Sequence, residues 1–434
     1  MLKYLKLQNV GPAPEMELEL GSRLNILTGD NGLGKSFLLD VVWYVATGSW
    51  PYELNPKISS GRVAEPATNK EGSIEAGWIG KGATNLIKLD FDRWERAWRN
   101  PDSAFVHDRL TFYFMADGSC AVVDALRNRL FEEHSARLRQ RLPAFVFDRH
   151  QIWNGLEQGE GDHRISHCNG LIRDWATWQL RGGESFDALQ KLLEILSPSA
   201  SEIMQAGALT RVGREDVRDV PSIRMPFGDE TPILYASAAI RRILSIAYII
   251  IWAWEEHKKA ALQSDTKKTA NKFLVLFDEV EAHLHPAWQR KILPSLLEIT
   301  KILSPDIELQ LIATTHSPLI MASLEPLFDA KTDAWFDLDL VGENGHREVK
   351  LEKREFEILG NADDWLTSEA FDLESTGSLA AEALMKEVEE AMDSTSFDYA
   401  QAKLLHEKLV RVLPADDTFF IRWRMIGKQK GWWK

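Results

Sequence analysis

The chain has 434 residues, a formal net charge of −14 and two cysteines. This length is enough for a large core or for roughly two to three lobes, and the negative charge argues against a protein that coats DNA by charge alone. Cys120 and Cys168 form no C-x-x-C motif, which favours a reducing compartment, so we expect a cytoplasmic protein.

Short alternating runs open the chain and predict strands at residues 2–4, 16–20 and 24–26. The first run, which begins at Met1, is typical of a strand rather than of a signal peptide. A helical run follows Ser36 and ends near Gly48. Together these elements predict a first α/β lobe over residues 1–50.

Residues 29–36 read Gly-Asp-Asn-Gly-Leu-Gly-Lys-Ser, a complete G-x-x-x-x-G-K-S phosphate loop between a strand and a helix. Backbone N–H groups of such a loop cradle the β- and γ-phosphates, helped by the helix N-terminus. Lys35 adds positive charge, and the Ser36 hydroxyl is a Mg²⁺ ligand. The predicted nucleotide-binding residues are Asp30, Asn31, Gly32, Gly34, Lys35 and Ser36.

The middle of the chain predicts a long insert, residues 51–230. Strand-like runs over residues 72–124, with a hairpin turn at Asp117-Gly118, indicate an antiparallel β-subdomain, and residues 171–196 are helical. Gln151 follows a predicted strand at residues 144–148. It is either a bridge between Mg²⁺ and the attacking water or an ordinary polar loop residue.

A second set of polar residues follows two further predicted strands. Residues 273–277 are apolar throughout, as in a parallel strand buried on both faces, and end in Asp278 and Glu279. Asp278 is placed to hold Mg²⁺, and Glu279 is placed to polarise the attacking water. The next strand, residues 308–313, leads to His316, which we expect to sense the γ-phosphate rather than to serve a structural role.

The order of these motifs resembles a known family. The phosphate loop, a long insert, Asp-Glu-x-Glu-x-His-Leu-His-Pro at residues 278–286 and Thr-His-Ser-Pro at residues 315–318 are similar to the ABC-type heads of the RecF, SMC and OLD-like group of AAA-family ATPases. The resemblance covers about residues 1–50 and 231–330. It implies ATP and Mg²⁺ as ligands and an α/β fold. The implied fold is an ABC-ATPase head with a mixed and parallel sheet, an antiparallel β-subdomain, a helical insert and a helical C-terminal region.

This resemblance also assigns residues that face a partner subunit. Residues 235–242 become the signature helix, with Ser237 as N-cap and contact to the γ-phosphate of the opposite subunit. The family has glycine beside this serine, where this chain has Ala238 and Ala239, and the loss of glycine bears on the hydrolysis rate. Residues 281–286 become the D-loop region. Its two histidines lack a third ligand at zinc spacing, so we do not expect a metal there.

The C-terminal part, residues 346–434, predicts a helical assembly or partner region after a second ATPase lobe at residues 231–345. Residues 361–400 carry a net charge of about −10, and residues 421–434 are basic and tryptophan-rich. That tail either docks on an acidic or phosphate surface or packs into its own domain. Asp337 and Asp339 form a D-x-D, which reads as an edge strand of the head rather than as a nuclease.

Residues 365–373 and 420–424, with the motifs above, resemble the ATPase subunits of bacterial anti-phage systems, in particular the Septu-type ATPase that is encoded beside an HNH nuclease. The resemblance implies a homodimer or higher homo-oligomer that sandwiches ATP and controls a nuclease effector. Nucleic acid would be contacted through that partner. We expect no membrane contact, because the most apolar stretch, residues 243–254, is too short to span a bilayer. The alternatives are a RecF-like repair ATPase that acts on DNA directly and a nucleotide-stabilised scaffold that scarcely hydrolyses ATP.

Overall fold

The computed structural model describes residues 1–79, 84–99, 109–128, 144–159, 164–226, 228–264, 268–342, 347–371, 373, 378–393, 398–414 and 417–433. The chain divides into two compact units, Met1–Gly360 and Asn361–Lys434. Within the described ranges, no helix is long and apolar enough to cross a membrane.

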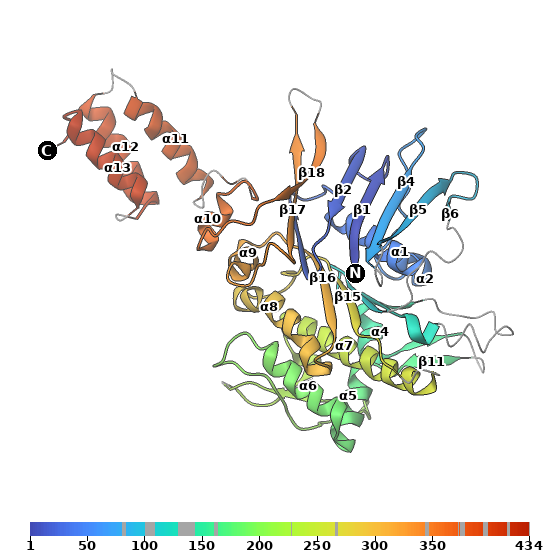
Figure 1. Ribbon diagram of the computed structural model, residues 1–434. Coiled ribbons are helices and arrows are strands. Elements are labelled where there is room, and N and C mark those ends of the chain that lie inside the picture. Colours follow the sequence, from blue (N-terminus) through green and yellow to red (C-terminus); the bar gives the residue numbers. More distant parts are fainter. Residues whose placement is uncertain are drawn as a thin grey trace. The chain divides into compact units, whose positions relative to one another are not determined.

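A mixed sheet is the centre of the first unit (Figure 1). Five adjacent strands run parallel, and antiparallel strands flank them at both ends. In the described residues the order is β18 (Glu348–Arg354), β17 (Ala334–Val341), β3 (Leu24–Gly29), β16 (Glu308–Thr314), β15 (Lys272–Phe277), β7 (Leu110–Phe114), β8 (Cys120–Asp124) and β9 (Phe145–Phe147).

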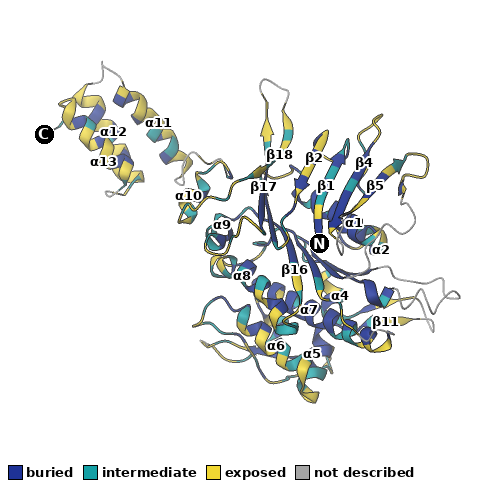
Figure 2. Cartoon of the chain, viewed as in Figure 1, coloured by how far each residue is buried: buried dark blue, intermediate teal, exposed yellow. Residues whose placement is uncertain are grey.

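The central strands are apolar along their whole length because both faces of the sheet are covered. On β15, Leu274 and Leu276 join the hydrophobic cluster that contains α1 (Lys35–Thr47). The alternate residues, Phe273 and Val275, line a small cavity with residues of α7 (Ala238–Gln263) and α8 (Pro286–Leu303). Figure 2 shows the resulting dark blue core and the more exposed β18. The α/β class predicted from the sequence is confirmed.

A second, antiparallel sheet packs over α1. Its order in the described residues is β2 (Glu15–Glu19), β1 (Leu2–Gln8), β4 (Ser73–Ile79), β5 (Thr84–Asp92) and β6 (Ala97–Arg99). The strands that the sequence groups into one subdomain, residues 72–124, are therefore divided between two sheets. Strand β7, which is buried at every residue, belongs to the mixed sheet and not to the second sheet. It pairs in parallel with β15 and antiparallel with β8.

The remaining elements of the first unit surround these sheets. Helices α5, α6, α7 and α8 gather together in Figure 1, and α6 contacts both α7 and α8. The further elements are α2 (Pro51–Leu54), α4 (Arg149–Asn154), β10 (Leu156–Gln158), β11 (Ile165–Cys168), α5 (Leu171–Arg181), α6 (Glu184–Ile195), β12 (Gln205–Ala206), β13 (Ser222–Arg224), β14 (Thr231–Pro232), η2 (Ile233–Tyr235) and α9 (Pro318–Leu324).

The D-x-D segment lies on β17, which the sequence predicts as an edge strand. That prediction is wrong, because β17 pairs with β3 on one side and with β18 on the other. Asp337 is buried and accepts a hydrogen bond from the Thr28 hydroxyl at 2.7 Å. Its carboxylate is thus part of the sheet packing. Among the described residues, no group of three or more histidine, cysteine or acidic side chains is arranged to hold a metal ion.

The second unit has its own hydrophobic core. Its helices are α10 (Ala362–Leu366), α11 (Leu379–Asp393), α12 (Tyr399–Val412) and α13 (Thr418–Gln429). Trp423 of α13 and Trp432 are buried in this core with Val388 of α11 and Leu409 of α12. These tryptophans therefore pack into their own domain, which is one of the two alternatives that the sequence leaves open for the basic tail.

Candidate functional site

The phosphate loop connects β3 to α1, as the sequence predicts. Gly29, Gly32 and Gly34 have φ of 119°, 80° and 105°, a region that favours glycine. A Cβ at Gly29 would lie 2.0 Å from the Leu338 carbonyl oxygen, so this loop packs directly on β17. At Gly32 a Cβ would meet nothing within 4 Å, and the left-handed backbone alone favours glycine there.

The Lys35 side chain folds back onto the loop. Its Nζ donates hydrogen bonds to the carbonyl oxygens of Gly29 at 2.8 Å and Asp30 at 2.7 Å. Burial lowers the pKa of Lys35, and the nearby Asp278 carboxylate opposes this shift. The ammonium is therefore held at the loop, whereas the side chains of Asp30 and Asn31 lie at the exposed surface.

Asp278 follows β15 and lies at the carboxyl edge of the sheet. Its Oδ1 accepts hydrogen bonds from the Ser36 hydroxyl at 3.0 Å and the Thr314 hydroxyl at 2.8 Å. The side chain is buried, and burial raises its pKa. The structure thus brings together two residues that are 242 positions apart. A hydroxyl and a carboxylate are the hard oxygen ligands that Mg²⁺ prefers beside a phosphate, so these residues fit that ion.

Glu279 is held in an unusual backbone conformation. Its φ is 45°, which costs a non-glycine residue on the order of 1–3 kcal/mol. The Glu279 N–H donates to the Thr314 hydroxyl at 2.7 Å, and the N–H of Val280 donates to the Thr314 carbonyl oxygen at 3.1 Å. Thr314 thereby fixes the turn that presents the half-buried Glu279 side chain.

Glu281 positions the neighbouring strand end. Its carboxylate accepts hydrogen bonds from the Thr315 hydroxyl at 2.8 Å and the backbone N–H of His316 at 2.5 Å. Burial raises the pKa of Glu281. Burial also lowers the pKa of His316, and the positive charge of Lys35 lowers it further. His316 is therefore a neutral imidazole at neutral pH, within electrostatic range of the phosphate-loop lysine.

Thr314 and Glu281 hold this edge together, and sequence reasoning gave neither a role in it. The sequence signal for Thr314 is its position at the end of a buried strand that neighbours β15. For Glu281 the signal is the second acid of the Asp-Glu-Val-Glu run. Both residues act through hydrogen bonds that join chain segments more than 30 residues apart. A local sequence pattern does not predict such contacts.

Gln151 lies on α4 and forms a capping box with Asp148. Its Oε1 accepts hydrogen bonds from the Asp148 N–H at 2.9 Å and from Asn55 Nδ2 at 2.7 Å. The amide oxygen is thus engaged at the start of α4, and a role for Gln151 toward Mg²⁺ stays a prediction.

Ser237 is the N-cap of α7, as the sequence predicts, and its hydroxyl accepts the Ile240 N–H at 3.3 Å. The side chains of Ser237 and Ala238 are exposed, whereas Ala239 is buried. The helix start therefore presents the Ser237 hydroxyl and the N-terminal end of α7 at the surface, which is the arrangement that favours an anion.

Comparisons with known proteins give a family and a few relatives. A family model described as "AAA domain, putative AbiEii toxin, Type IV TA system" matches residues 81–322, and a second AAA domain model matches residues 4–152. The "Retron Ec83 probable ATPase" of Escherichia coli is 40% identical over 52 residues. That match spans 12% of this chain and 8% of the length of the relative.

Solved structures of SMC heads and RecF are also similar. The SMC head bound to the C-winged helix domain of ScpA is 14% identical with a TM-score of 0.41, covering 82% of this chain and 98% of that one. The SMC head of Thermotoga maritima is 14% identical with a TM-score of 0.37, covering 80% of this chain and 98% of that one. ATP-bound RecF is 12% identical with a TM-score of 0.35, covering 82% of this chain and 97% of that one. Since the first family model covers more than half of the 434 residues, this chain belongs to the AAA-domain ATPase family that carries the description "putative AbiEii toxin, Type IV TA system".

Proposed function

We propose that this protein binds and hydrolyses ATP in a Mg²⁺-dependent reaction at the edge formed by the phosphate loop, Asp278 and His316. The observation that carries the proposal is the hydrogen-bonded set of Ser36, Asp278 and Thr314 beside the Lys35 ammonium. Three chain segments converge there, each at the carboxyl end of a parallel strand, which is where open α/β sheets bind ligands.

The residues of this edge divide the chemistry among them. Backbone N–H groups of residues 30–36 and the Lys35 ammonium bind the phosphates, and Ser36 and Asp278 would hold Mg²⁺, which neutralises charge on the β- and γ-phosphates. Glu279 accepts a proton from the water that attacks the γ-phosphorus. The neutral imidazole of His316 hydrogen-bonds the γ-phosphate and so reports whether it is present.

A second copy of the chain would complete the site. Ser237 and the exposed start of α7 offer a hydroxyl and backbone N–H groups to the γ-phosphate held by the partner's phosphate loop. ATP would then join two copies, and hydrolysis would release them. In this proposal the helical second unit serves assembly or partner binding, and the ATPase lobes lie in the first unit.

We further propose that the output is a defence response delivered by a nuclease partner, of the HNH type found beside Septu-type ATPases. Two comparisons support a role in defence: the description of the matched family as a putative AbiEii toxin, and the 52-residue match to a retron ATPase. Contact with nucleic acid would be made through the nuclease.

One observation favours a second candidate, a scaffold that binds ATP and scarcely hydrolyses it. Ala238 and Ala239 stand at the start of α7, where the resembling family has glycine, and Ala239 is already packed in the fold. A methyl group at this position limits how closely a partner's phosphate can approach the backbone.

The test is a pair of variants compared with the wild type in phosphate-release and calorimetric assays. Glu279→Gln is expected to keep ATP affinity and to lower turnover by a factor on the order of 10²–10⁴. Lys35→Ala is expected to weaken ATP binding at least about tenfold, or about 1.4 kcal/mol. Unchanged affinity in Lys35→Ala would refute the phosphate-loop assignment. A wild type that binds ATP without turnover, even with its nuclease partner, would establish the scaffold.

A further inference from the structure

A cavity of about 430 Å³ lies in the first unit between α4 and α7. Its α7 wall is formed by Ala238, Arg241, Arg242 and Ser245. This i, i+3, i+4, i+7 spacing is one lateral face of the helix, and the N-cap Ser237 is not part of the lining. The cavity is thus beside the helix and not at its tip. The remaining lining residues are Gly118, Arg149, His150, Trp153, Asn154, Leu234 and His283.

The lining is strongly basic in a chain whose net charge is −14. It contains three arginines and two histidines, and none of the described lining residues is acidic. Arg149, Arg241 and His150 are exposed at the cavity. The Nε of Arg149 donates a hydrogen bond to the Asp117 carbonyl oxygen, so part of this guanidinium is already engaged. A hydrogen bond of 3.0 Å from Trp153 Nε1 to the Ser245 hydroxyl fixes the two helices to each other.

Arg242 is the inner residue of this wall, and only 8% of it is exposed. Its Nε and Nη2 atoms are buried without a hydrogen-bond partner among the described residues. The guanidinium lies over the Phe277 ring, 5.4 Å from the centroid. Burial lowers the pKa of Arg242 to about 10, and at neutral pH it stays charged. Buried guanidinium N–H groups without hydrogen-bond partners are costly. Because Arg242 lines the cavity, an anion bound there would offset the cost of its buried charge.

We propose that this cavity binds a free phosphate-bearing small molecule of mononucleotide size, at a site separate from the phosphate loop. Guanidinium groups match phosphate oxygens in geometry and charge, and the volume is within the range of small-molecule sites. Trp153 and Leu234 give the cavity an apolar part that suits a base or sugar. Because Arg242 packs on Phe277, the residue before Asp278, an occupant would act on the edge that carries the ATPase site.

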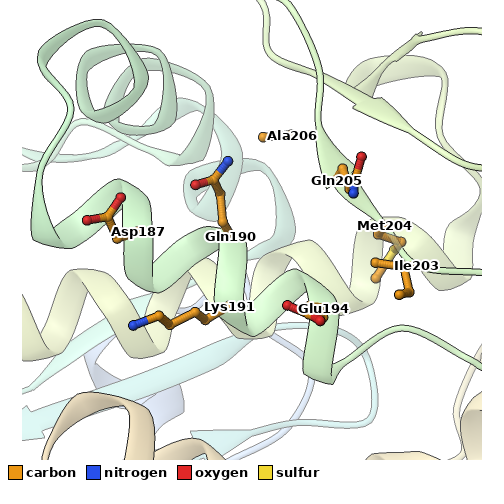
Figure 3. A pocket seen from close by; sticks show the side chains of 8 residues that line it. All are labelled: Asp187, Gln190, Lys191, Glu194, Ile203, Met204, Gln205 and Ala206. Atoms are coloured by element: carbon orange, nitrogen blue, oxygen red, sulfur yellow. The ribbon is translucent and has the colours of Figure 1, made fainter. Parts of the chain in front are cut away.

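A second cavity of the first unit differs from this one in the charges that line it. It measures about 530 Å³ and lies between α6 and residues 203–206 (Figure 3). Asp187 and Glu194 face it with Lys191 as the one cation among the described lining residues, so a phosphate would meet more negative than positive charge. Lys191 therefore provides the matched control for a change of charge in the basic cavity.

The experiment uses the full chain with Lys35→Ala, which weakens the phosphate loop, and inorganic tripolyphosphate as the probe in calorimetry without Mg²⁺. We expect saturable binding that weakens by about tenfold or more when Arg242→Gln or Arg149→Gln is added. Lys191→Gln should leave the affinity unchanged. Thermal melting checks that each variant is folded, and the exposed Arg149 keeps the test valid if Arg242→Gln unfolds.

Absence of binding by the Lys35→Ala protein would overturn the proposal, and so would equal affinities in all the variants. In one form of the first result, the Lys35→Ala protein does not bind tripolyphosphate but does bind ATP-loaded copies that have an intact phosphate loop, and this binding requires Arg241. The cavity would then take ATP presented by a second copy. Since the phosphate loop is tested separately by Lys35→Ala in the wild-type background, failure here leaves the proposed ATPase function standing.

Discussion

Asp40 on α1 is a half-buried carboxyl close to the ATPase edge. The Tyr113 hydroxyl donates to its Oδ1 at 2.7 Å. Burial raises the pKa of Asp40 to about 7, and the neighbouring Asp278 carboxylate contributes in the same direction. Two carboxyl groups in one low-dielectric region resist ionising together. Near neutral pH the charge at this edge therefore depends on whether Asp40 holds a proton.

This protonation predicts a pH-dependent stability. The folded protein keeps a proton on Asp40 that the unfolded chain releases near pH 4, so the free energy of unfolding falls as the pH rises from about 4 to about 7. The slope from this one group is at most about 1.4 kcal/mol per pH unit. Asp40→Asn should remove it and be more stable than wild type at pH 7.5, but not at pH 4. Urea unfolding at both values tests this. The prediction is contradicted if the free energy of unfolding changes by the same amount between pH 4 and pH 7.5 in the wild type and in Asp40→Asn.

At the level of single residues, the sequence predicts where the phosphate loop and Asp278 lie in the fold, because each follows a strand that its own residues specify. It predicts the surroundings poorly. Asp148 and Gln151 form a capping box three residues apart, a pattern that is readable in the sequence but is not part of the sequence-based expectation for Gln151. The contacts of Asp40 and Glu281 join distant segments, and only the folded chain reveals them.

Helix α7 combines a structural and a proposed functional role in its N-cap, and substitutions can separate them. Ser237→Ala removes the cap and should lower the free energy of unfolding by about 1 kcal/mol. Ser237→Asp keeps a good cap and suits the helix dipole, but it places a negative charge where a partner's phosphate would bind. We expect Ser237→Asp to melt no lower than wild type and to lose ATP turnover. Full turnover in Ser237→Asp would exclude Ser237 from the site.

At the level of elements, the sequence patterns of β7 and β17 do not predict which strands they pair with. Residues 110–114 look like one arm of an antiparallel hairpin, and β7 does pair with β8 in that way. Its other edge pairs in parallel with β15, which begins about 160 residues later, as the residue numbers show. Strand pairs of such separation depend on which faces the whole fold buries, so the sheet order was beyond prediction whereas the individual strands were not.

At the level of the whole molecule, the second unit is expected to fold on its own core. Trp433 lies so close to Gly427 that a Cβ there would be 1.9 Å from its ring, and Trp432 is buried. Deleting residues 427–434 should therefore loosen this unit and leave ATP affinity unchanged. Limited proteolysis, with cuts expected in residues 361–426, and calorimetry with ATP measure the two effects. A second unit that stays resistant to protease after the deletion would contradict this account.

The central claim is that two copies complete each other's ATPase site, and a mixing experiment tests it most directly. Lys35→Ala lacks a working phosphate loop, and Ser237→Asp lacks a working partner surface, so each protein alone should be inactive. A mixed dimer has one intact loop facing one intact Ser237. Random pairing should thus restore up to about a quarter of wild-type turnover. Lys35→Ala mixed with Glu279→Gln should restore nothing, because both changes fall on the loop-bearing side. If Lys35→Ala and Ser237→Asp remain inactive together, or if Ser237→Asp is active alone, sharing of the site between copies is contradicted.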